Sequence, residues 1–593
     1  MIAFFAAAVF FDGRPAAAQS TLLSSVLGGD SLDSDATLLL RKLGKKASET
    51  KLKALAELRE AIPARGPDWA GSLLPHWTLT FARLADDGSW QVREQSCIAL
   101  DLLAKEVRRQ FAPHLKQLIA PWLRCRFDAQ QDVRRAAMRA FESAFPAEGK
   151  YAQALAFCRD ELVRALAELV KAPPPAKTGD ADADADAVEA YTRRVSTSLQ
   201  ALAHLISEAV AAAGGGGGVG TATQSSALAA LGGQLTEQLL DAKFWRLGAA
   251  KTTPVRCAVY TFSLTLLQRL PDLAVEMAEP LATALLDGLS DREPAAHAAL
   301  WDPLLLLLRS HPTALQASTA GKHILPRLLS LLRNGCFGAA TTVSSALLPL
   351  ASLLPEDLVL PPSDGGPAPA AQLLGAIWEG LRSDSLPAAH FRALLTAHAE
   401  LLQLLVAKAS ASPTARYELL AVGIGGPLAL FLEGELPPRL KDTVAVDSLC
   451  AAVVALAASS RCTDALDSYL PALVASCQRA CLPRSSGGLG VQHAPSRATN
   501  LLITLRRQLQ RASTTGASSA AASTACAARC SVLTLYTARL WSRMLMEACP
   551  AVGRWAPSIV AAAGSSSSGH GSASGGDVGA VAVELTEAFG IQR

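Results

Sequence analysis

The sequence predicts an all-α protein assembled from repeated helices. Hydrophobic residues make up 50% of the 593-residue chain but aromatic residues only 5%, so Ala and Leu dominate, and these favour helices over strands. Apolar residues recur at intervals of three and four over most of the chain, as they do on one face of a helix. A chain of this length also exceeds what one hydrophobic core organises, so several domains or one long array are expected.

A short pattern repeats in the N-terminal half, in which an apolar residue is followed by a basic one. The interval is 40 residues from the first copy to the second and 41 from the second to the third, and the fourth follows two low-complexity insertions. A period of about 40–47 residues is typical of HEAT and armadillo repeats. We therefore predict a HEAT/armadillo-like helical-repeat superhelix (α-solenoid) with flexible low-complexity insertions. The four copies are Leu52–Lys53, Val92–Arg93, Val133–Arg134 and Val255–Arg256.

Each later copy carries an apolar face at helical spacing, and the helix before the second and third copies carries bulkier residues. Small residues opposite bulky ones let paired helices pack closely, and one pair buries its apolar face only by stacking on the next. The repeat faces are Val92, Ser96, Ala99, Leu103 and Val107; Val133, Ala137, Ala140 and Ala144; and Val255, Val259, Phe262, Leu266 and Leu270. The bulky faces are Leu74, Trp77, Phe81 and Leu84, then Leu115, Leu118, Ile119 and Trp122.

Breaks in this periodicity predict the order of segments. Residues 1–34 form a poorly defined N-terminal segment, whose apolar run Ile2–Phe11 is shorter than the roughly 20 residues that span a bilayer. Because no basic residues precede that run, we expect neither a secretory signal nor a membrane partner. The following segments are HEAT-like repeats at 35–171, an insertion with an acidic and a Gly-rich linker at 172–225, HEAT-like repeats at 226–360, a Pro/Gly-rich loop at 361–370, irregular helical repeats at 371–563 and a Ser/Gly-rich tail at 564–593.

Motifs of catalysis are missing from the sequence: it shows no phosphate-binding P-loop, no H-E-x-x-H and no G-x-S-x-G. We predict no catalytic, cofactor-binding or metal-binding residue. None of the 12 cysteines forms a C-x-x-C pair, and we interpret Cys477/Cys481 and Cys526/Cys530 as small buried hydrophobic residues. The acidic run Asp180–Asp186 lacks the turn glycine and distal glutamate of a calcium loop and is interpreted as a solvated linker. Unpaired cysteines are typical of a reducing compartment, so we expect a cytosolic protein.

Two clusters of basic residues are candidates for partner binding. The net charge is only +3, so attraction of a polyanion would have to be local. Clustered Lys and Arg can neutralise phosphates, and without interleaved aromatic residues such a contact would reach the nucleic-acid backbone only. The alternative, which the sequence leaves open, is that these residues are merely solvated on outer helix faces. The candidates are Lys45, Lys46, Lys51, Lys53, Arg108 and Arg109.

The stretch RFDAQQDVRRAAMRAFESAFP, from Arg126 to Pro146, combines two adjacent arginines with an aspartate and could be taken for a reactive site. Its first arginine, Arg134, recurs as Arg93 and Arg256, which predicts a structural role where repeats meet. Arg135 does not recur and is interpreted as a surface charge.

Several segments follow one another along the chain in a recognisable order. The first are TLLLRKLGKKASETKLKAL, FAPHLKQLIAPWLRCRFDAQQDVRRAAMRAFESAFP and ALAFCRDELVRALAEL, and the later ones are KFWRLGAAKTTPVRCAVYTFSLTLL, AAHAALWDPLLLLLR and LLRNGCFG. This ordered series resembles listerin, the large RING-type E3 ubiquitin ligase of ribosome-associated quality control. These segments lie within residues 35–170 and 235–360, and the similarity is weak beyond them.

The resemblance implies a scaffold that docks on stalled 60S ribosomal subunits, so that nascent chains become ubiquitinated. Its partners would be the 60S subunit, with contact at most to rRNA backbone, and the quality-control factor that recognises peptidyl-tRNA. The E2 enzyme would bind only through the zinc-binding RING, whose C-x-x-C pairs this sequence lacks, so we expect a non-catalytic N-terminal part of a longer protein without a cofactor of its own. The alternative is a generic HEAT/armadillo adaptor that binds proteins without ribosome association.

Overall fold

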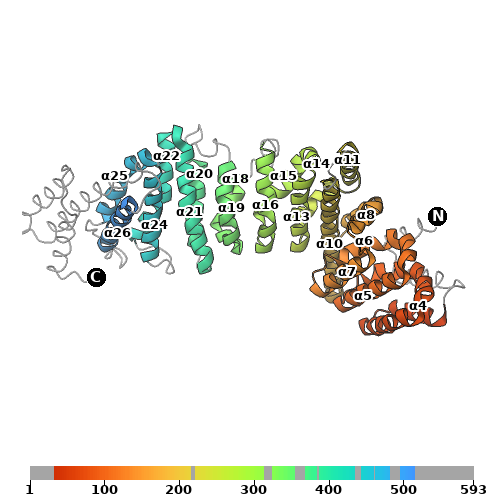
Figure 1. The fold of residues 1–593 in the computed structure, drawn as a ribbon. Helices are drawn as coiled ribbons and strands as arrows, with labels where there is room; N and C mark the ends of the chain where they lie inside the picture. Colours follow the sequence, from red (N-terminus) through yellow and green to blue (C-terminus); the bar gives the residue numbers. More distant parts are fainter. Residues whose placement is uncertain are drawn as a thin grey trace, which may run out of the picture. The chain divides into compact units, whose positions relative to one another are not determined.

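The computed structural model describes residues 33–214, 221–312, 324–353, 368–382, 386–433, 442–459, 461–480 and 494–514. These ranges are helical nearly throughout and contain no strand, which confirms the predicted all-α helical-repeat fold (Figure 1). Residues 1–32, most of the predicted loop at 361–370 and the tail at 564–593 lie outside the described residues. The chain forms two compact units. The first comprises Met1–Asp291 with Ala298–Lys322, and the second comprises Arg292–His297 with His323–Arg593.

The first unit contains short and long helices joined by tight turns. Its elements are α3 (Ser34–Leu43), α4 (Ser48–Leu84), α5 (Trp90–Val107), the 3₁₀ helix η1 (Arg108–His114), α6 (Leu115–Cys125), α7 (Gln131–Ala144), α8 (Lys150–Phe157), α9 (Arg159–Lys171), α10 (Ala181–Gly214), α11 (Thr221–Gln238), α12 (Ala242–Trp245), η2 (Arg246–Ala249), α13 (Thr253–Arg269), α14 (Pro271–Glu276), α15 (Ala278–Asp287) and η3 (Gly288–Ser290), followed by α16 (Pro294–Ser310), at whose start the two units divide.

The first half of α4, then α5 and then α7, run side by side as the repeating helices of the array (Figure 1). α4 is two helices joined at Gly66, whose φ of 79° lies in the left-handed region that favours glycine. Pro67, which follows, lacks a backbone N–H and suits the start of the second helix. The kink lets the second half of α4 turn back as the bulky partner of α5, with Trp77 and Phe81 fully buried.

The predicted repeat faces are buried, and the packing between them explains why. Every member named in the sequence is buried except Ala144, which is half-buried near the end of α7. Trp122 of α6 stacks on Phe141 of α7 with ring centroids 3.8 Å apart, and its Nε1 donates to the carbonyl oxygen of Ala137 at 3.1 Å. Such stacked aromatic pairs stabilise a helix pair beyond the area they bury.

The structure differs from the predicted linker insertion at 172–225, because most of this segment is helical. Residues 181–214 form one 34-residue helix, α10, which packs against α6, α9 and α13. The DADADAD run lies in the exposed first turns of this helix. The carboxylate of Asp180 accepts hydrogen bonds from the backbone N–H groups of Asp182 and Ala183, so it caps the start of the helix. From Tyr191 onward it is a core helix, with Val195 and Leu199 fully buried. The acidic run is therefore the start of a helix, since acidic residues are favourable beside a helix N-terminus.

The second unit continues as paired helices with one close backbone crossing. Gly380 lies so close to the end of α18 that a Cβ there would fall 2.0 Å from the carbonyl oxygen of Leu332. The turn after α18 is left-handed over Gly335, Cys336, Phe337 and Gly338. The elements are α18 (Ile324–Arg333), η5 (Gly335–Gly338), α19 (Ala340–Leu353), α20 (Pro369–Leu381), α21 (Ala388–Lys408), η7 (Ala409–Ala411), α22 (Pro413–Leu420), the π-helical turn η8 (Ala421–Gly425), α23 (Gly426–Glu433), α24 (Asp442–Ala458), α25 (Thr463–Ala480) and α26 (Ala494–Thr514).

Candidate functional site

Arg93, in the first turn of α5, forms a buried ion pair that joins two repeats. Its Nε and Nη2 atoms donate to the two carboxylate oxygens of Asp128 at 2.7 and 3.0 Å. Its Nη1 atom donates to the carbonyl oxygens of Asp87 and Gly88 at 2.8 and 3.1 Å. Only 4% of the Arg93 side chain and 3% of the Asp128 side chain are exposed. A two-pronged pair of this kind, with the remaining donors satisfied, offsets the cost of burying two charges.

Arg256 repeats this geometry in α13. Its Nη1 donates to the carbonyl oxygens of Ala250 and Lys251 at 2.7 and 3.1 Å, and its Nε and Nη2 donate to Asp291 at 2.5 and 2.8 Å. In both copies the carbonyl acceptors lie six and five residues before the arginine and the carboxylate lies 35 residues after it. The structural role predicted for the recurring basic position is confirmed. We call this series of basic residues and carboxylates the arginine ladder.

Of the first three copies of the ladder, only the second, at Arg93, has the complete set of bonds; the first and the third differ from it. In the first copy Lys53 is exposed, and Lys51 instead pairs with the carboxylate of Asp87. In the third copy Arg134 keeps the carbonyl bonds, to Asp128 and Ala129 at 2.6 and 2.9 Å. Position 169, 35 residues further on, is a leucine, and no carboxylate bond to Arg134 is present among the described residues.

The carboxylates of the arginine ladder were not predicted from the sequence, although the sequence contains a signal for them. Asp87 precedes Arg93 by six residues, and Asp128 precedes Arg134 by the same interval. Asp291 likewise precedes His297, which lies 41 residues after Arg256 and is fully buried. An aspartate six residues before the basic position therefore marks these carboxylates in the sequence.

The turn between α4 and α5 gathers two further arginines. Arg124 of α6 pairs with the carboxylate of Asp86. Arg193 of α10 donates through Nη2 to the carbonyl oxygens of Asp86 and Asp87 at 2.9 and 3.1 Å. Burial lowers the pKa of Arg193, and the nearby charge of Arg93 lowers it further. This turn therefore connects α10 to the N-terminal repeats, a connection hidden from the sequence because Arg193 falls in the predicted insertion.

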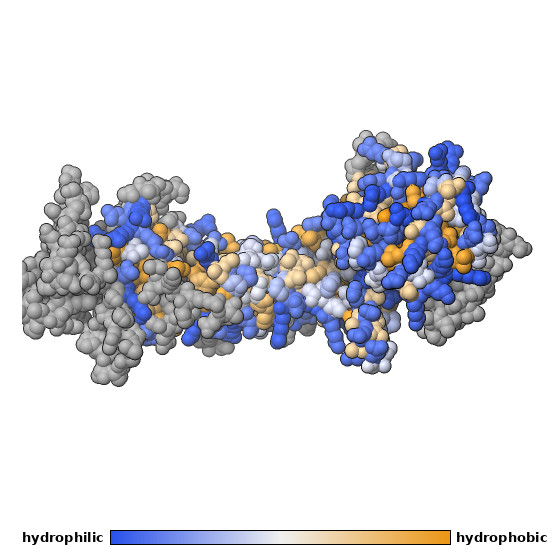
Figure 2. All heavy atoms as spheres, turned by 90° about the horizontal axis from the view of Figure 1, so that it is seen from below, coloured by the Kyte–Doolittle hydropathy of each residue, from blue (hydrophilic) through white to orange (hydrophobic). Residues whose placement is uncertain are grey.

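Three of the predicted partner-binding residues, Lys45, Lys46 and Lys53, are exposed where α3 gives way to α4. Lys51 differs, because only 15% of its side chain is exposed and its ammonium group pairs with Asp87. Hydrophilic residues cover most of the visible face of the first unit's helices, at the right of Figure 2. Lys45, Lys46 and Lys53 thus form a solvent-accessible cationic cluster, whereas the geometry gives Lys51 a part in repeat stacking.

The other predicted pair, Arg108 and Arg109, is also exposed but lies at the opposite end of α5. Lys51 contacts the turn before α5, while Arg108 begins η1 directly after that 18-residue helix. A helix of this length spans about 27 Å. The structure therefore does not bring the two predicted clusters together. Arg108 itself has a φ of 47°, an unusual conformation for a residue with a Cβ.

A cluster of titratable groups joins α8 and α10 near the end of α6. Nη1 of Arg126 donates to the hydroxyl oxygen of Tyr151 at 3.0 Å, and that hydroxyl lies 2.9 Å from Nε2 of His204. Burial raises the pKa of Tyr151 to about 12 and lowers the pKa of His204 to about 4, with Arg126 adding to the lowering. Both groups are thus neutral near pH 7, and the cluster serves packing rather than proton transfer.

Metal and membrane signals are weak in the described part of the chain. Among the described residues no three His, Cys, Asp or Glu side chains gather as a metal site would require. Cys477 is buried, as interpreted, while Cys481, Cys526 and Cys530 lie outside the described residues. One stretch, Pro413–Glu433, is long and apolar enough to cross a membrane, but half of it is buried inside the protein, as in a core helix.

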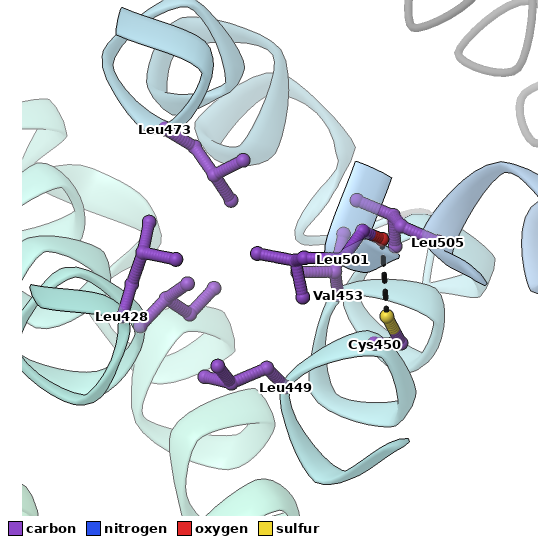
Figure 3. A pocket seen from close by; sticks show the side chains of 8 residues that line it. Leu428, Leu449, Cys450, Val453, Leu473, Leu501 and Leu505 are labelled. Carbon is purple, nitrogen blue, oxygen red and sulfur yellow. Dashed lines mark hydrogen bonds between the residues drawn. The ribbon is translucent and has the colours of Figure 1, made fainter. Parts of the chain in front are cut away.

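A small apolar cavity lies in the second unit between α23, α24, α25 and α26 (Figure 3). Leu428, Leu449, Val453 and Leu473 point into it, and the thiol of Cys450 donates to the carbonyl oxygen of Leu501 at 3.8 Å. Burial raises the pKa of Cys450 to about 12, which keeps this thiol protonated and unreactive. The lining of the cavity is apolar, so we do not interpret it as a catalytic site.

Comparison with known proteins gives consistent matches for the first part of the chain. The family model "E3 ubiquitin-protein ligase listerin, N-terminal domain" matches residues 32–354. The listerin E3 ubiquitin-protein ligase of Mus musculus is 31% identical over 338 residues, which is 56% of this chain and 18% of that protein. The listerin of Drosophila melanogaster is 26% identical over 320 residues, covering 53% and 18%. The chain thus spans about a fifth of the length of these curated relatives.

Solved structures match more broadly and more weakly. A crystal structure of an engineered protein aligns with 79% of this chain and 99% of its own, at a TM-score of 0.33 and 14% identity. Yeast importin-beta (Kap95p) aligns with 91% of this chain and 79% of its own, at a TM-score of 0.29 and 12% identity. Scores of this size carry no argument about function.

Proposed function

This chain belongs to the listerin family, whose N-terminal domain it carries, and on that premise we propose that it is the ribosome-docking scaffold of a listerin-type E3 ubiquitin ligase. The observation that carries the proposal is the family match over residues 32–354, which contains both the arginine ladder and the exposed cluster of Lys45, Lys46 and Lys53. The ladder supports a rigid stack of helices, and a rigid stack can hold exposed side chains at fixed positions for a large partner.

The proposed partners follow the resemblance. The scaffold would dock on stalled 60S subunits in the cytosol, with contact at most to rRNA backbone, beside the quality-control factor that recognises peptidyl-tRNA. A cationic cluster supports such a contact, since it neutralises phosphates without reading sequence. Because these 593 residues contain no C-x-x-C pair, we assign zinc binding, E2 recruitment and ubiquitin transfer to a RING outside them, and propose no cofactor for this chain.

Cosedimentation of the chain with purified 60S subunits tests the proposal. We expect the chain to pellet with 60S subunits at low salt and to dissociate as salt rises, because each neutralised phosphate releases a counterion. The triple variant Lys45→Glu, Lys46→Glu, Lys53→Glu is expected to lose about tenfold or more in affinity. Lys51 is left unchanged, because a glutamate there would face Asp87 and disturb the fold.

The matched control carries the same charge change elsewhere in the first unit, at the exposed residues Lys150, Arg164 and Lys177. It should bind nearly as the wild type does. A separate variant, Arg108→Glu with Arg109→Glu, tests the second cluster by itself. A chain that folds but fails to pellet with 60S subunits at any salt concentration would overturn the proposal in favour of a generic adaptor without ribosome association.

A further inference from the structure

The regular stacking of the first three repeats ends at one flank of α7. α5 packs extensively against both α4 and α7. Among the described helices α7 packs extensively only against α5, with smaller contacts to α6 and, through Phe141 and Phe145, to Tyr151 of α8. Nearer the start of α7, away from these aromatic contacts, Arg134 is only half-buried and Met138 is exposed. We call Arg134 and Met138, which lie one helical turn apart there, the open flank.

Arg134 carries the first observation. Its Nη1 atom is held by the carbonyl oxygens of Asp128 and Ala129, six and five residues earlier, as Nη1 is held in Arg93 and Arg256. In those two copies the same anchoring aims Nε and Nη2 at a carboxylate, from Asp128 or Asp291. Arg134 has no such carboxylate bond among the described residues and is only half-buried. Its Nε–Nη2 edge is thus oriented for a carboxylate that the described chain does not supply.

Met138 carries the second observation, which does not depend on the first. It lies 41 residues after Cys97, the same interval that separates Arg134 from Arg93. Cys97 is fully buried, whereas 42% of Met138 is exposed. A flexible apolar side chain is therefore exposed to solvent at a position whose equivalent in the preceding copy, Cys97, is buried. Arg135 and Arg139, exposed on the same side of α7, add positive charge beside it.

We propose that the open flank docks a helical segment of a protein partner that presents an aspartate or glutamate in the turn before its helix. The carboxylate would accept from Nε and Nη2 of Arg134, and the partner helix would cover Met138, extending the ladder by one repeat. The chain supplies the template, because Asp128, which Arg93 binds, stands in the turn before α7. The flank's positive charge favours an acidic segment, and both internal examples bind a carboxylate rather than a phosphate. This inference goes beyond ribosome docking and does not require it.

A fluorescein-labelled peptide copying residues 126–145 serves as the probe, since it contains Asp128 and the helix that follows. Fluorescence anisotropy of this peptide with the full chain is expected to show saturable binding. A peptide with Asp128→Asn should bind about tenfold more weakly, because a neutral amide loses the charge-assisted pair. Arg134→Lys in the chain should weaken binding to a similar degree, since an ammonium group lacks the guanidinium fork. Met138→Asp should weaken it as well.

The matched control is Arg135→Gln, which removes an exposed charge one residue away and should leave affinity within about twofold. Arg134→Gln removes the fork entirely, and its folding is checked by circular dichroism, with Arg134→Lys retained as the milder variant. Three outcomes would overturn the proposal: no binding of either peptide to the wild-type chain, equal affinity for the two peptides, or binding indifferent to Arg134. Displacement of the peptide by single-stranded RNA that itself depends on Arg134 would reassign the flank to phosphate.

Discussion

The guanidinium group of Arg93 is surrounded by acceptors that all belong to the repeat junction: a carboxylate from one turn and two carbonyl oxygens from another. At the residue scale, a basic side chain here acts as part of the core. Its charge is compensated where it lies, so it is unavailable to a partner. The exposed Arg135, whose pair with Asp132 spans 3.5 Å at the surface, has little structural weight by comparison.

Removal of the Arg93 charge should therefore destabilise the first unit strongly. We expect Arg93→Gln to lower its free energy of unfolding by about 3–5 kcal/mol, because Asp128 is left buried without its partner. Arg135→Gln should change it by less than about 0.5 kcal/mol. Urea denaturation followed by circular dichroism measures both. The double variant Arg93→Gln with Asp128→Asn should cost less than the sum of the single variants, and strict additivity would contradict a direct pair.

We expect the stability of the second unit to depend on pH through His398. It is 3% exposed and accepts a hydrogen bond from Nε1 of Trp378 at Nε2, 3.0 Å away. Burial lowers its pKa from 6.5 to about 4 in the folded state. The unfolded chain therefore takes up a proton first as pH falls, so this contribution is fully present above about pH 6.5 and is lost between about pH 6.5 and 4.

The expected loss is about 3 kcal/mol over that window, from a shift of roughly two to three pKa units. Chemical denaturation at pH 7.5, 6, 5 and 4.5 measures it. His398→Gln should remove most of the slope from the second unit. An unchanged slope in His398→Gln would contradict the assignment.

At the scale of elements, close backbone contacts decide where helices cross. α18 and α20 approach at Gly380, where no side chain fits against the carbonyl oxygen of Leu332. α4 bends at Gly66, where a positive φ lets one continuous segment supply two helices of different repeats. Both positions require glycine because it has no Cβ. A Cβ would clash with a carbonyl oxygen at Gly380 and would strain the backbone at Gly66.

Gly380→Ala is the sharper test of this crossing. We expect a loss of at least about 1–3 kcal/mol in the stability of the second unit, because the new methyl group forces two helices apart. Gly426→Ala is the control, since a Cβ there meets nothing within 4 Å. In the helical backbone of α23 that alanine should be neutral or stabilise by up to about 1 kcal/mol. Thermal unfolding of both variants measures the difference, and equal melting temperatures would refute the close contact.

At the scale of the whole molecule, the chain has two compact units, each with its own buried helices. Units with separate cores are expected to unfold in separate steps. Differential scanning calorimetry should resolve two transitions. Arg93→Gln should lower only the transition of the first unit and Gly380→Ala only that of the second. One transition that moves as a whole in both variants would show that the array unfolds as a single cooperative body.

The sequence alone determined the helical class, the 40- and 41-residue intervals and the buried faces, because helix periodicity and side-chain size are local properties. It also pointed to the structural use of Arg93 and Arg256, through their recurrence. The tertiary structure alone decided which carboxylates those arginines bind, because each partner lies 35 residues away and is brought near only by stacking. Only the tertiary structure showed that most of the predicted insertion is a core helix. Only it showed that Lys51 is largely buried in an ion pair while the lysines near it in sequence are exposed. The reason is that burial depends on what packs against a residue rather than on its neighbours in sequence.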